Sequence, residues 1–597
     1  MKIQMNRQTM KKSAPDQVID SEKEYHMMKK NKKILIPVIA VLVIVCVIAM
    51  VFIAKKYKPN KEVMSLEEYF QVPENQIQII LQDEIYDTKG LYSDGQIYVD
   101  VDLVKKYLNS RFYWDAKENL LLYTTPNAVI SASTGSKDYF TNKSRSSKEY
   151  PIVKVEKDVA YVALDYVKDY SALDYTKYDN PNRVVINYRF NEKADYAKAE
   201  SKAKLRYEPS IKSEILVSFE EGEEIRILEE ESGSEGKKSD FCRAMSVSGV
   251  IGYIRKKDLG KTYESEFTTD FKAETYPHIL KNEKVSLVWH QVTTSAANDG
   301  ILNLLNATKG VNVVAPTWFT VSGNKGEITS LASDTYVSRA HSMGVEVWGL
   351  CNDFSNDSKI GKVLGQTTPR QKLEKNLIAE AIRYSLDGIN IDFEYVKKEN
   401  GEDFIQFVRE LGIMCRNNGI VLSIDNYPPT DYSQYYNRTE QAAVADYVIT
   451  MAYDEHYAGS EEAGPVSSLS YVQNSTTNTL AQVPAEQTII ALPFYSRLWK
   501  ETTKDGEVKL SSEAYSMKYA KEVFEDAGIE PVWDDKTGMY YGEYTKDDSL
   551  YKMWMEDEKS LEEKVKAATA GKVAGLAFWK LGLENSSAWD MIIKYTN

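Results

Sequence analysis

Three polar side chains share one face of a short apolar stretch around position 391. Asn390, Asp392 and Glu394 alternate with apolar residues at positions 389, 391 and 393. A β-strand sends successive side chains to opposite faces, so these polar groups lie on one face with neighbours about 6–7 Å apart. A helical pattern precedes the stretch and its other face is strongly apolar, which favours a buried strand over an edge strand with a solvated face. Two carboxyl groups at the end of such a strand suit a general acid and an assisting group.

Residues 387–394 have the sequence Asp-Gly-Ile-Asn-Ile-Asp-Phe-Glu. This run resembles the signature of glycoside hydrolase family 18, the chitinase-like TIM barrels, which is written D-G-x-D-x-D-x-E. One letter departs, because Asn390 stands where most chitinases have Asp. The final acid of the signature is present as Glu394.

The C-terminal half of the chain has the strand pattern of a (β/α)8 barrel, a fold that takes about 250 residues. We expect an α/β fold of this TIM-barrel type over residues 280–597, with the acidic strand as the fourth of eight. About 80 residues separate the last two candidate strands, too many for an ordinary loop. We therefore predict a small α+β insertion at about residues 500–560, forming one wall of a groove. The candidate strands are residues 285–289, 311–316, 345–350, 387–394, 420–424, 447–454, 488–493 and 575–580.

Further motifs extend the resemblance along the barrel. Residues 451–454 match the family's M-x-Y-D at the sixth strand, and Trp579 matches the tryptophan under the sugar at the eighth. Residues 316–319, 492–495 and 579–582 resemble the branch that acts on bacterial cell wall and spore cortex. Asn at position 390 is at home in that branch, which frequently carries SH3 or LysM modules.

The resemblance implies substrate-assisted, retaining hydrolysis next to N-acetylglucosamine, in which the sugar's own 2-acetamido oxygen attacks the anomeric carbon. Glu394 would protonate the leaving oxygen and later activate water. Asp392 would hold the acetamido N–H and stabilise the positive charge, and Tyr453 would hydrogen-bond the acetamido carbonyl. The expected substrate-binding residues are Asn390, Met451, Asp454, Tyr495, Trp318 and Trp579. For any single tryptophan, however, a place in the core is the commoner role.

The departure at Asn390 leads to a separate hypothesis. An Asp at this position would lie close to Asp392, and neighbouring like charges raise one of the two pKa values. Asn carries no charge and is able to donate a hydrogen bond to Asp392. We therefore expect Asp392 to ionise more easily and to work without proton exchange on its inner side.

Residues 34–54 form an uncharged apolar run. As a helix, 21 residues span the roughly 30 Å hydrocarbon core of a bilayer. A cleaved signal peptide and a buried core helix are the alternatives, but the run is long for the first and lacks the polar residues of the second. Lysines flank both ends, and the positive-inside rule favours a cytoplasmic tail at residues 1–33. The protein would then sit in the cell membrane with one span and an extracellular catalytic domain.

Two smaller modules are predicted between this run and the barrel. Residues 65–190 contain an internal repeat, in which 98–107 recurs as 161–170, and each copy has the pattern strand, short helix, turn, strand. This module resembles the small N-terminal domain of some copper amine oxidases, which implies no copper here because it contains no His or Cys; a spacer or wall contact is its expected role. Residues 198–262 resemble a bacterial SH3 domain, with apolar alternation between glycine turns. Binding of cell-wall peptide and an inert spacer are equally open for this second module.

Composition narrows the functional classes. The formal net charge is −14, which argues against a nucleic-acid-binding surface. The four cysteines are scattered and only five histidines are present. Cys46 lies in the apolar run, and we expect the other three to be buried free thiols; no motif supports a metal or nucleotide cofactor. The expected partners are peptidoglycan or another N-acetylglucosamine glycan, and a membrane through one helix. A non-catalytic glycan-binding protein, a cell-wall scaffold and a chitinase remain the alternatives.

Overall fold

The computed structural model describes residues 21–200, 202–232, 238–504 and 507–596. Most of the predicted tail, residues 1–20, therefore lies outside the described residues. The chain divides into two compact units, one of residues 1–89 with 174–268 and one of residues 90–173 with 269–597. The predicted module at 65–190 is shared between these two units.

The first unit begins with a long helix, α1 (Ser21–Tyr57), whose segment Pro37–Tyr57 has the length and composition to cross a membrane. None of that segment is buried against the rest of the described chain. Its apolar side chains are exposed, which is the expected state of a helix whose partner is lipid. A signal sequence near an N-terminus would have the same composition, so the anchor stays a prediction.

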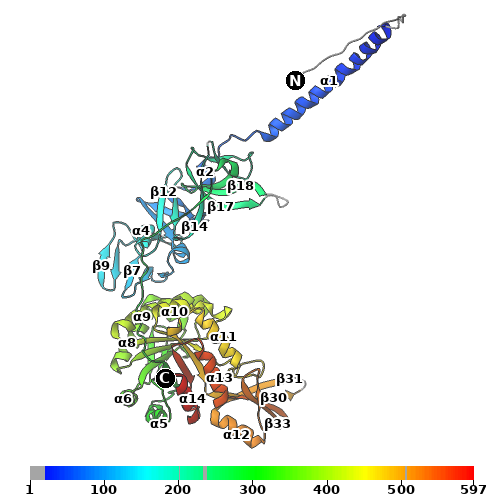
Figure 1. Cartoon of the computed structure of the whole chain (residues 1–597). Helices are drawn as coiled ribbons and strands as arrows, with labels where there is room; N and C mark the ends of the chain where they lie inside the picture. The colour runs from blue at the N-terminus through cyan, green and yellow to red at the C-terminus, as the bar shows by residue number, and fades with distance from the viewer. Residues whose placement is uncertain (1–20, 201, 233–237, 505–506, 597) are drawn as a thin grey trace, which may run out of the picture. The chain divides into compact units, whose positions relative to one another are not determined.

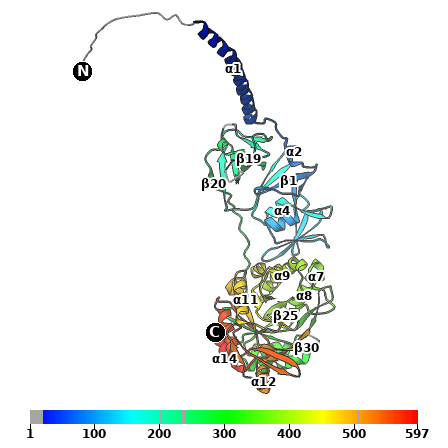
Figure 2. The same ribbon diagram turned by 90° about the vertical axis from the view of Figure 1, so that its right-hand side faces the viewer.

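The first unit also contains two β-structures (Figure 2). Short helix α2 (Leu66–Phe70) precedes β1 (Gln76–Leu81), which pairs in parallel with β13 (Arg183–Asn187), while β12 (Asp174–Tyr178) pairs with β13 on its other side. A second, antiparallel sheet has the order β16-β15-β19-β18-β17-β14-β20. Whether this sheet is a bacterial SH3 domain stays a prediction. Its strands are β14 (Lys193–Lys198), β15 (Lys204–Arg206), β16 (Ile215–Ser218), β17 (Glu224–Ser232), β18 (Lys238–Ser246), β19 (Ile251–Arg255) and β20 (Tyr263–Glu266).

The internal repeat has the predicted pattern of elements. In the first copy a strand leads into a short helix and two further strands: β4 (Gln96–Asp100), α3 (Val101–Leu103), β5 (Phe112–Asp115) and β6 (Leu120–Thr124). The second copy repeats this order as β11 (Val159–Ala163), α4 (Leu164–Lys168), β12 and β13. The first copy continues into an antiparallel sheet with β7 (Val129–Ser133), β8 (Asp138–Thr141) and β9 (Ser144–Ser147). Strands β3 (Gly90–Ser93) and β10 (Val153–Glu156) flank β4 and β11.

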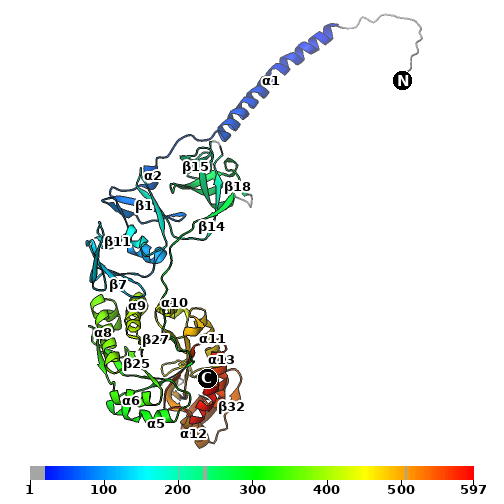
Figure 3. The ribbon, with the colours of Figure 1, turned by 60° about the vertical axis from the view of Figure 1, so that its left-hand side comes forward.

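The second unit contains a closed barrel of eight parallel strands (Figures 1 and 3). The strands pair in the order β22-β21-β35-β29-β28-β27-β26-β25, and a parallel pairing of β22 with β25 closes the ring. All eight predicted strands are present, and the acidic strand is the fourth. The barrel strands are β21 (Val285–His290), β22 (Val313–Pro316), β25 (Glu346–Asn352), β26 (Gly388–Asp392), β27 (Val421–Asn426), β28 (Tyr447–Met451), β29 (Thr488–Pro493) and β35 (Gly575–Trp579).

Helices surround the barrel because each strand sends alternate side chains outward into an apolar layer. Ile389, Ile391 and Phe393 belong to that layer and are at most 2% exposed. Ser333, Ser468 and Asp557 each begin a helix by accepting a hydrogen bond from a backbone N–H of the first turn. The outer helices are α5 (Ile301–Asn306), α6 (Asp334–Ser342), α8 (Thr367–Arg383), α9 (Gly401–Asn418), α10 (Arg438–Val444), α11 (Leu469–Leu480), α13 (Glu558–Thr569) and α14 (Ser586–Thr596). Hairpin β23 (Phe319–Ser322) with β24 (Glu327–Ser330) and helix α7 (Ile360–Leu364) lie in the loops.

An α+β insertion follows the seventh barrel strand, as the spacing predicts. Its antiparallel sheet has the order β31-β30-β34-β33-β32, and helix α12 (Met517–Ala527) packs on it through Ala520 and Phe524. The opposite sheet face carries Trp499, whose indole N–H donates to the carbonyl of Gly464 in the loop after the sixth strand. The insertion is thereby tied to the carboxyl end of the barrel strands. The strands are β30 (Tyr495–Lys504), β31 (Glu507–Ser516), β32 (Val532–Asp534), β33 (Met539–Lys546) and β34 (Ser549–Met555).

The turn between β5 and β6 contacts the barrel within the second unit. The Asp115 carboxylate, 2% exposed, accepts hydrogen bonds from the backbone N–H and the hydroxyl of Thr367 at 2.6 and 2.7 Å. Glu118 makes the same two bonds with Thr368. These residues open helix α8, whose own N-cap side chain, that of Gln366, makes no capping bond. The repeat module therefore supplies the N-terminal cap of a barrel helix.

Candidate active site

The carboxyl end of the fourth barrel strand presents the polar row that alternation predicts. Asn390 and Asp392 lie on β26 and Glu394 follows it directly. The outward residues of the same strand pack against helices, so the polar side chains turn to the barrel axis. Active sites of this fold occur at this end of the barrel.

A cavity of about 720 Å³ opens over these strands. Six of the nine predicted site residues line it, from the fourth, sixth and eighth strands and the loops that follow. Its aromatic rim suits a sugar, because apolar ring faces stack on sugar faces while hydroxyl groups bond at the edges. The lining residues are Trp289, Phe354, Asp392, Glu394, Tyr395, Asp425, Tyr427, Met451, Tyr453, Asp454, Tyr457, Tyr471 and Trp579.

Asn390 is fully buried beneath this cavity and makes three hydrogen bonds. Its amide nitrogen donates to Ser423 Oγ at 3.0 Å and to Asp425 Oδ1 at 2.8 Å. Its amide oxygen accepts from Trp289 Nε1 at 2.9 Å. The expected hydrogen bond from Asn390 to Asp392 is absent from this arrangement, because both amide protons are directed to strand β27. The expectation that Asn390 binds substrate is also corrected, because Asn390 is buried beneath the cavity and its amide group is bonded to neighbouring residues.

Asp392 is 6% exposed, and its Oδ1 has no hydrogen-bond partner among the described residues. Burial raises the pKa of this carboxyl well above its usual range, and the neighbouring acids Asp425, Glu394 and Asp353 raise it further. Whether Asp392 ionises more easily beside Asn390 than beside an Asp at that position stays a prediction. The neighbouring acid that raises the pKa of Asp392 most is Asp425, on the adjacent strand β27, and not a residue at position 390.

Glu394 is half-buried, and burial raises its pKa, while a hydrogen bond donated by the Tyr427 hydroxyl lowers it and the nearby charge of Asp454 raises it. A raised pKa favours the protonated form of the carboxyl, which is the form a general acid requires. Its backbone N–H donates to Asp353 Oδ1 at 3.0 Å, and the next N–H, of Tyr395, donates to Asp353 Oδ2 at 2.9 Å. Asp353 thus holds the turn that carries the acid, and burial raises the pKa of Asp353 to about 6.

The loop after the sixth strand brings Tyr453 and Asp454 into the cavity. Burial raises the pKa of Tyr453 well above its usual value, so its hydroxyl stays a hydrogen-bond donor. Tyr495, at the start of the insertion, donates its hydroxyl proton to Asp454 Oδ1 and is 6% exposed. Tyr495 does not line the cavity itself and contacts it through Asp454, so its role in substrate binding stays a prediction.

The two predicted site tryptophans have different surroundings. Trp579 is half-buried at the end of the eighth strand and its ring lies 6.0 Å from that of Trp289, so one face borders the cavity. Trp318 is 1% exposed, donates its indole N–H to Asn298 at 2.8 Å and packs edge-on against Tyr336. The expectation that Trp318 binds substrate is corrected: it is a core residue whose polar atom is already satisfied.

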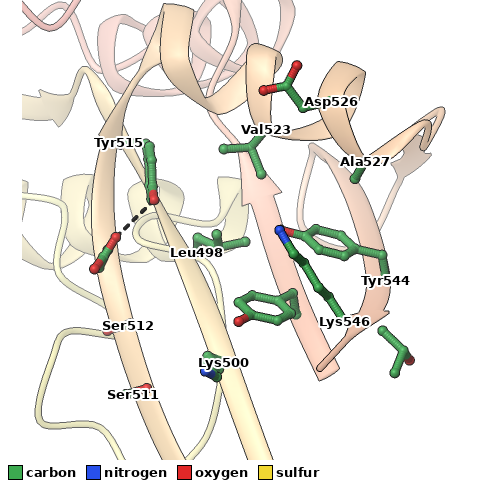
Figure 4. A pocket seen from close by; sticks show the side chains of 13 residues that line it. Leu498, Lys500, Ser511, Ser512, Tyr515, Val523, Asp526, Ala527, Tyr544 and Lys546 are labelled. Carbon is green, nitrogen blue, oxygen red and sulfur yellow. Dashed lines mark hydrogen bonds between the residues drawn. The ribbon is translucent and has the colours of Figure 1, made fainter. Parts of the chain in front are cut away.

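A second hollow of about 730 Å³ lies in the insertion, between the sheet and the end of α12 (Figure 4). Tyr544 and Tyr551 stack there with ring centroids 5.0 Å apart, and Tyr515 donates to Glu513. Its two acids, Glu513 and Asp526, are both exposed. In the barrel cavity Asp392 and Asp425 are buried and Glu394 is half-buried beside them, so the barrel cavity is the site with the chemistry of an acid catalyst.

Several residues of the site were missed from the sequence, among them Trp289, Asp353, Asp425 and Tyr427. For two of them a signal was available, because Ser423, Asp425 and Tyr427 repeat the polar alternation of the acidic strand. Pairing of Asn390 with Ser423 sets the two polar rows side by side.

Comparisons with known proteins agree with this geometry. Residues 329–584 match the model of glycosyl hydrolases family 18, and residues 80–187 match that of the copper amine oxidase N-terminal domain. The chain is 26% identical over 303 residues to an uncharacterized glycosylase, YvbX, of Bacillus subtilis (strain 168), covering 48% of this chain and 85% of the relative. It is 24% identical over 247 residues to the cortical fragment-lytic enzyme of the same organism, covering 40% of this chain and only 56% of that relative.

Among solved structures, the spore cortex-lytic enzyme SleL of Bacillus megaterium QM B1551 is 19% identical, with a TM-score of 0.47 and coverage of 54% of this chain and 77% of that one. The matched family segment begins in β24 and ends beyond β35, so it contains the acidic strand and all the predicted site residues except Trp318. The barrel is therefore a glycosyl hydrolase family 18 domain, and the chain that carries it is a glycosidase.

Proposed function

We propose that this protein hydrolyses β-1,4 bonds next to N-acetylglucosamine in peptidoglycan. The observation that carries the proposal is the pairing of Glu394 with the buried Asp392 in one cavity, bordered by Trp579. An oxygen of Asp392 without a donor offers a place for an acetamido N–H. The choice of peptidoglycan is supported by the cortical fragment-lytic relative, a name that describes that relative and not this chain.

The proposed reaction is substrate-assisted and retains the anomeric configuration. Glu394 gives its proton to the glycosidic oxygen as the bond from that oxygen to C1 breaks. The acetamido oxygen bonds to C1, and Asp392 accepts the acetamido N–H while the ring becomes positively charged. Water then attacks C1 as the bond from the acetamido oxygen to C1 breaks, and the water gives a proton to Glu394, so the enzyme ends as it began.

The decisive experiment incubates the full-length protein, purified in detergent, with peptidoglycan and separately with chitin oligomers. We expect mass spectrometry to find new reducing N-acetylglucosamine ends from peptidoglycan, and none with Glu394→Gln, which keeps the size of the side chain but carries no acidic proton. Release from chitin alone would make the protein a chitinase. No release from either substrate, with peptidoglycan still retained in a pull-down, would contradict catalysis and favour a glycan-binding protein.

We further propose that α1 anchors the enzyme in the cell membrane, with the catalytic barrel outside. This rests on the apolar segment Pro37–Tyr57 and on the wall substrate proposed above. We expect the protein in the membrane fraction, resistant to extraction by carbonate, with the barrel digested by protease added to intact cells. Release of a shortened, soluble chain would instead identify the segment as a cleaved signal.

A further inference from the structure

Strand β27 places a second polar row beside the catalytic one. Ser423 pairs with Asn390 across the two parallel strands, and Ile424 pairs with Ile391. One pleat further along, Asp425 therefore lies next to Asp392, and both carboxyls line the same cavity. The family signature does not include this second acid, because it lies 31 residues beyond Glu394 in the sequence.

Asp425 is deeply buried and held by one specific donor. It is 3% exposed, and the Asn390 amide donates to its Oδ1 at 2.8 Å. The orientation of that amide is determined by Trp289, because an indole N–H donates only and so requires the amide oxygen. The amide protons must then point to β27. The hydrogen bonds therefore run in one direction: Trp289 donates to Asn390, and Asn390 donates to Asp425.

We propose that Asp425 is a positioning residue for Asp392: it carries the negative charge of the pair in the free enzyme and accepts the proton of Asp392 when substrate binds. This inference rests on the proposed function, because it assigns Asp392 to the acetamido group. It also explains how the site works with Asn at position 390. A second carboxyl group is still present on the inner side of Asp392, but Asp425 of the neighbouring strand supplies it in place of a residue at position 390.

The proton count of the pair is one throughout. In the free enzyme the amide donor stabilises the carboxylate of Asp425, while Asp392, with an oxygen that has no donor, holds the proton. When an acetamido N–H reaches Asp392, the ionised form of Asp392 gains a donor and its proton passes to Asp425. The pair keeps a charge of −1, and no covalent bond of the substrate changes in this step.

The surroundings oppose a second charge in the pair. Glu394 raises the pKa of both carboxyls, and Asp353, at the end of β25, acts on Asp392 as well. Tyr453, from the loop after β28, faces both acids as a neutral hydroxyl. Burial itself disfavours two neighbouring carboxylates, which favours the retention of one proton by the pair.

The test exchanges the two side chains in the full-length protein. We expect Asp425→Asn to lower kcat/KM about a hundredfold and to alter the pH profile. The double exchange, Asn390→Asp with Asp425→Asn, keeps one inner carboxyl within reach of Trp289 Nε1, so it should recover at least about tenfold of that loss. Ser423→Ala is the matched control: it removes a buried polar contact to the same amide without altering a charge, and should leave the shape of the pH profile unchanged.

A second readout is independent of hydrolysis. Infrared difference spectra of wild type against Asp425→Asn should show a protonated carboxyl band at neutral pH that the variant lacks, because Asp392 without its charged neighbour ionises. A wild-type pH profile in Asp425→Asn, in an enzyme that Glu394→Gln inactivates, would overturn the inference while the proposed function stands. If the wild type hydrolyses neither glycan, the proposed function fails, and the infrared band alone then decides whether the pair shares a proton.

Discussion

Replacing Tyr427 with Phe should move the alkaline limb of the pH–rate profile to higher pH. The Tyr427 hydroxyl donates to the Glu394 carboxylate, a bond that favours the ionised form and so lowers the pKa of Glu394. A hydrogen bond to a charged group contributes about 1.5–3 kcal/mol. Tyr427 is 39% exposed, so water competes and the lower value applies. At about 1.36 kcal/mol per pKa unit, the pKa of Glu394 should rise by about one unit.

The sign follows from the role of Glu394. The free enzyme needs this carboxyl protonated, so kcat/KM falls as pH rises through its pKa, and a higher pKa extends activity to higher pH. The assay is the pH dependence of kcat/KM on a soluble N-acetylglucosamine oligomer derived from whichever glycan the enzyme cleaves. Tyr436→Phe is the matched control, because the Tyr436 hydroxyl donates to the carbonyl of Phe393 at 2.9 Å rather than to the acid. An unmoved or lowered alkaline limb in Tyr427→Phe would refute the assignment of Glu394 as the acid that Tyr427 tunes.

Two further predictions concern stability. Asp115→Ala removes the cap that Thr367 uses at the start of α8, so the free energy of unfolding should fall by about 1–2 kcal/mol in urea titrations. Glu118→Ala, at a less buried position of the same turn, should lower the free energy of unfolding less. Equal losses in the two variants would contradict a capping role specific to Asp115. Lys564→Met leaves Glu556 fully buried without its ion-pair partner, so about 3–5 kcal/mol should be lost. Replacing both members by Met should recover most of that loss, and a double variant as unstable as the single one would point to packing instead of charge.

The barrel was predictable because its signals are local. Each strand of a parallel barrel is buried on both faces, so its residues form a short apolar run between helical patterns. That signal identified all eight strands, and the long gap before the last one indicated the insertion. The signature residues at positions 392 and 394 were predictable for the same reason, since strand alternation alone puts them on one face.

Side-chain partners across strands were not predictable in this way. Asn390 was expected to bond to Asp392, two residues away on its own strand, yet its partners are Trp289, Ser423 and Asp425. Neighbours two apart on a strand point the same way but stand about 6–7 Å apart, whereas residues opposite on a paired strand lie about 5 Å apart. Of the three partners, Ser423 is the residue opposite Asn390, Asp425 lies two residues further along the same strand, and Trp289 comes from β21, so all three depend on the packing of other strands.

The tryptophans illustrate the same limit. Trp318 and Trp289 are both fully buried, and each donates its indole proton to an asparagine. The functional difference lies in the asparagine: Asn298 continues to a backbone carbonyl, at 2.9 Å, and ends there, whereas Asn390 continues to a buried acid beside the catalytic carboxyl. An indole that bonds to neither carboxyl can thus direct the amide that decides where a carboxylate pair keeps its charge. The Trp289 indole can only donate, so it sets which end of the Asn390 amide faces Asp425. Replacement of Trp289 should therefore alter the pH profile through Asp425 as well as lower stability.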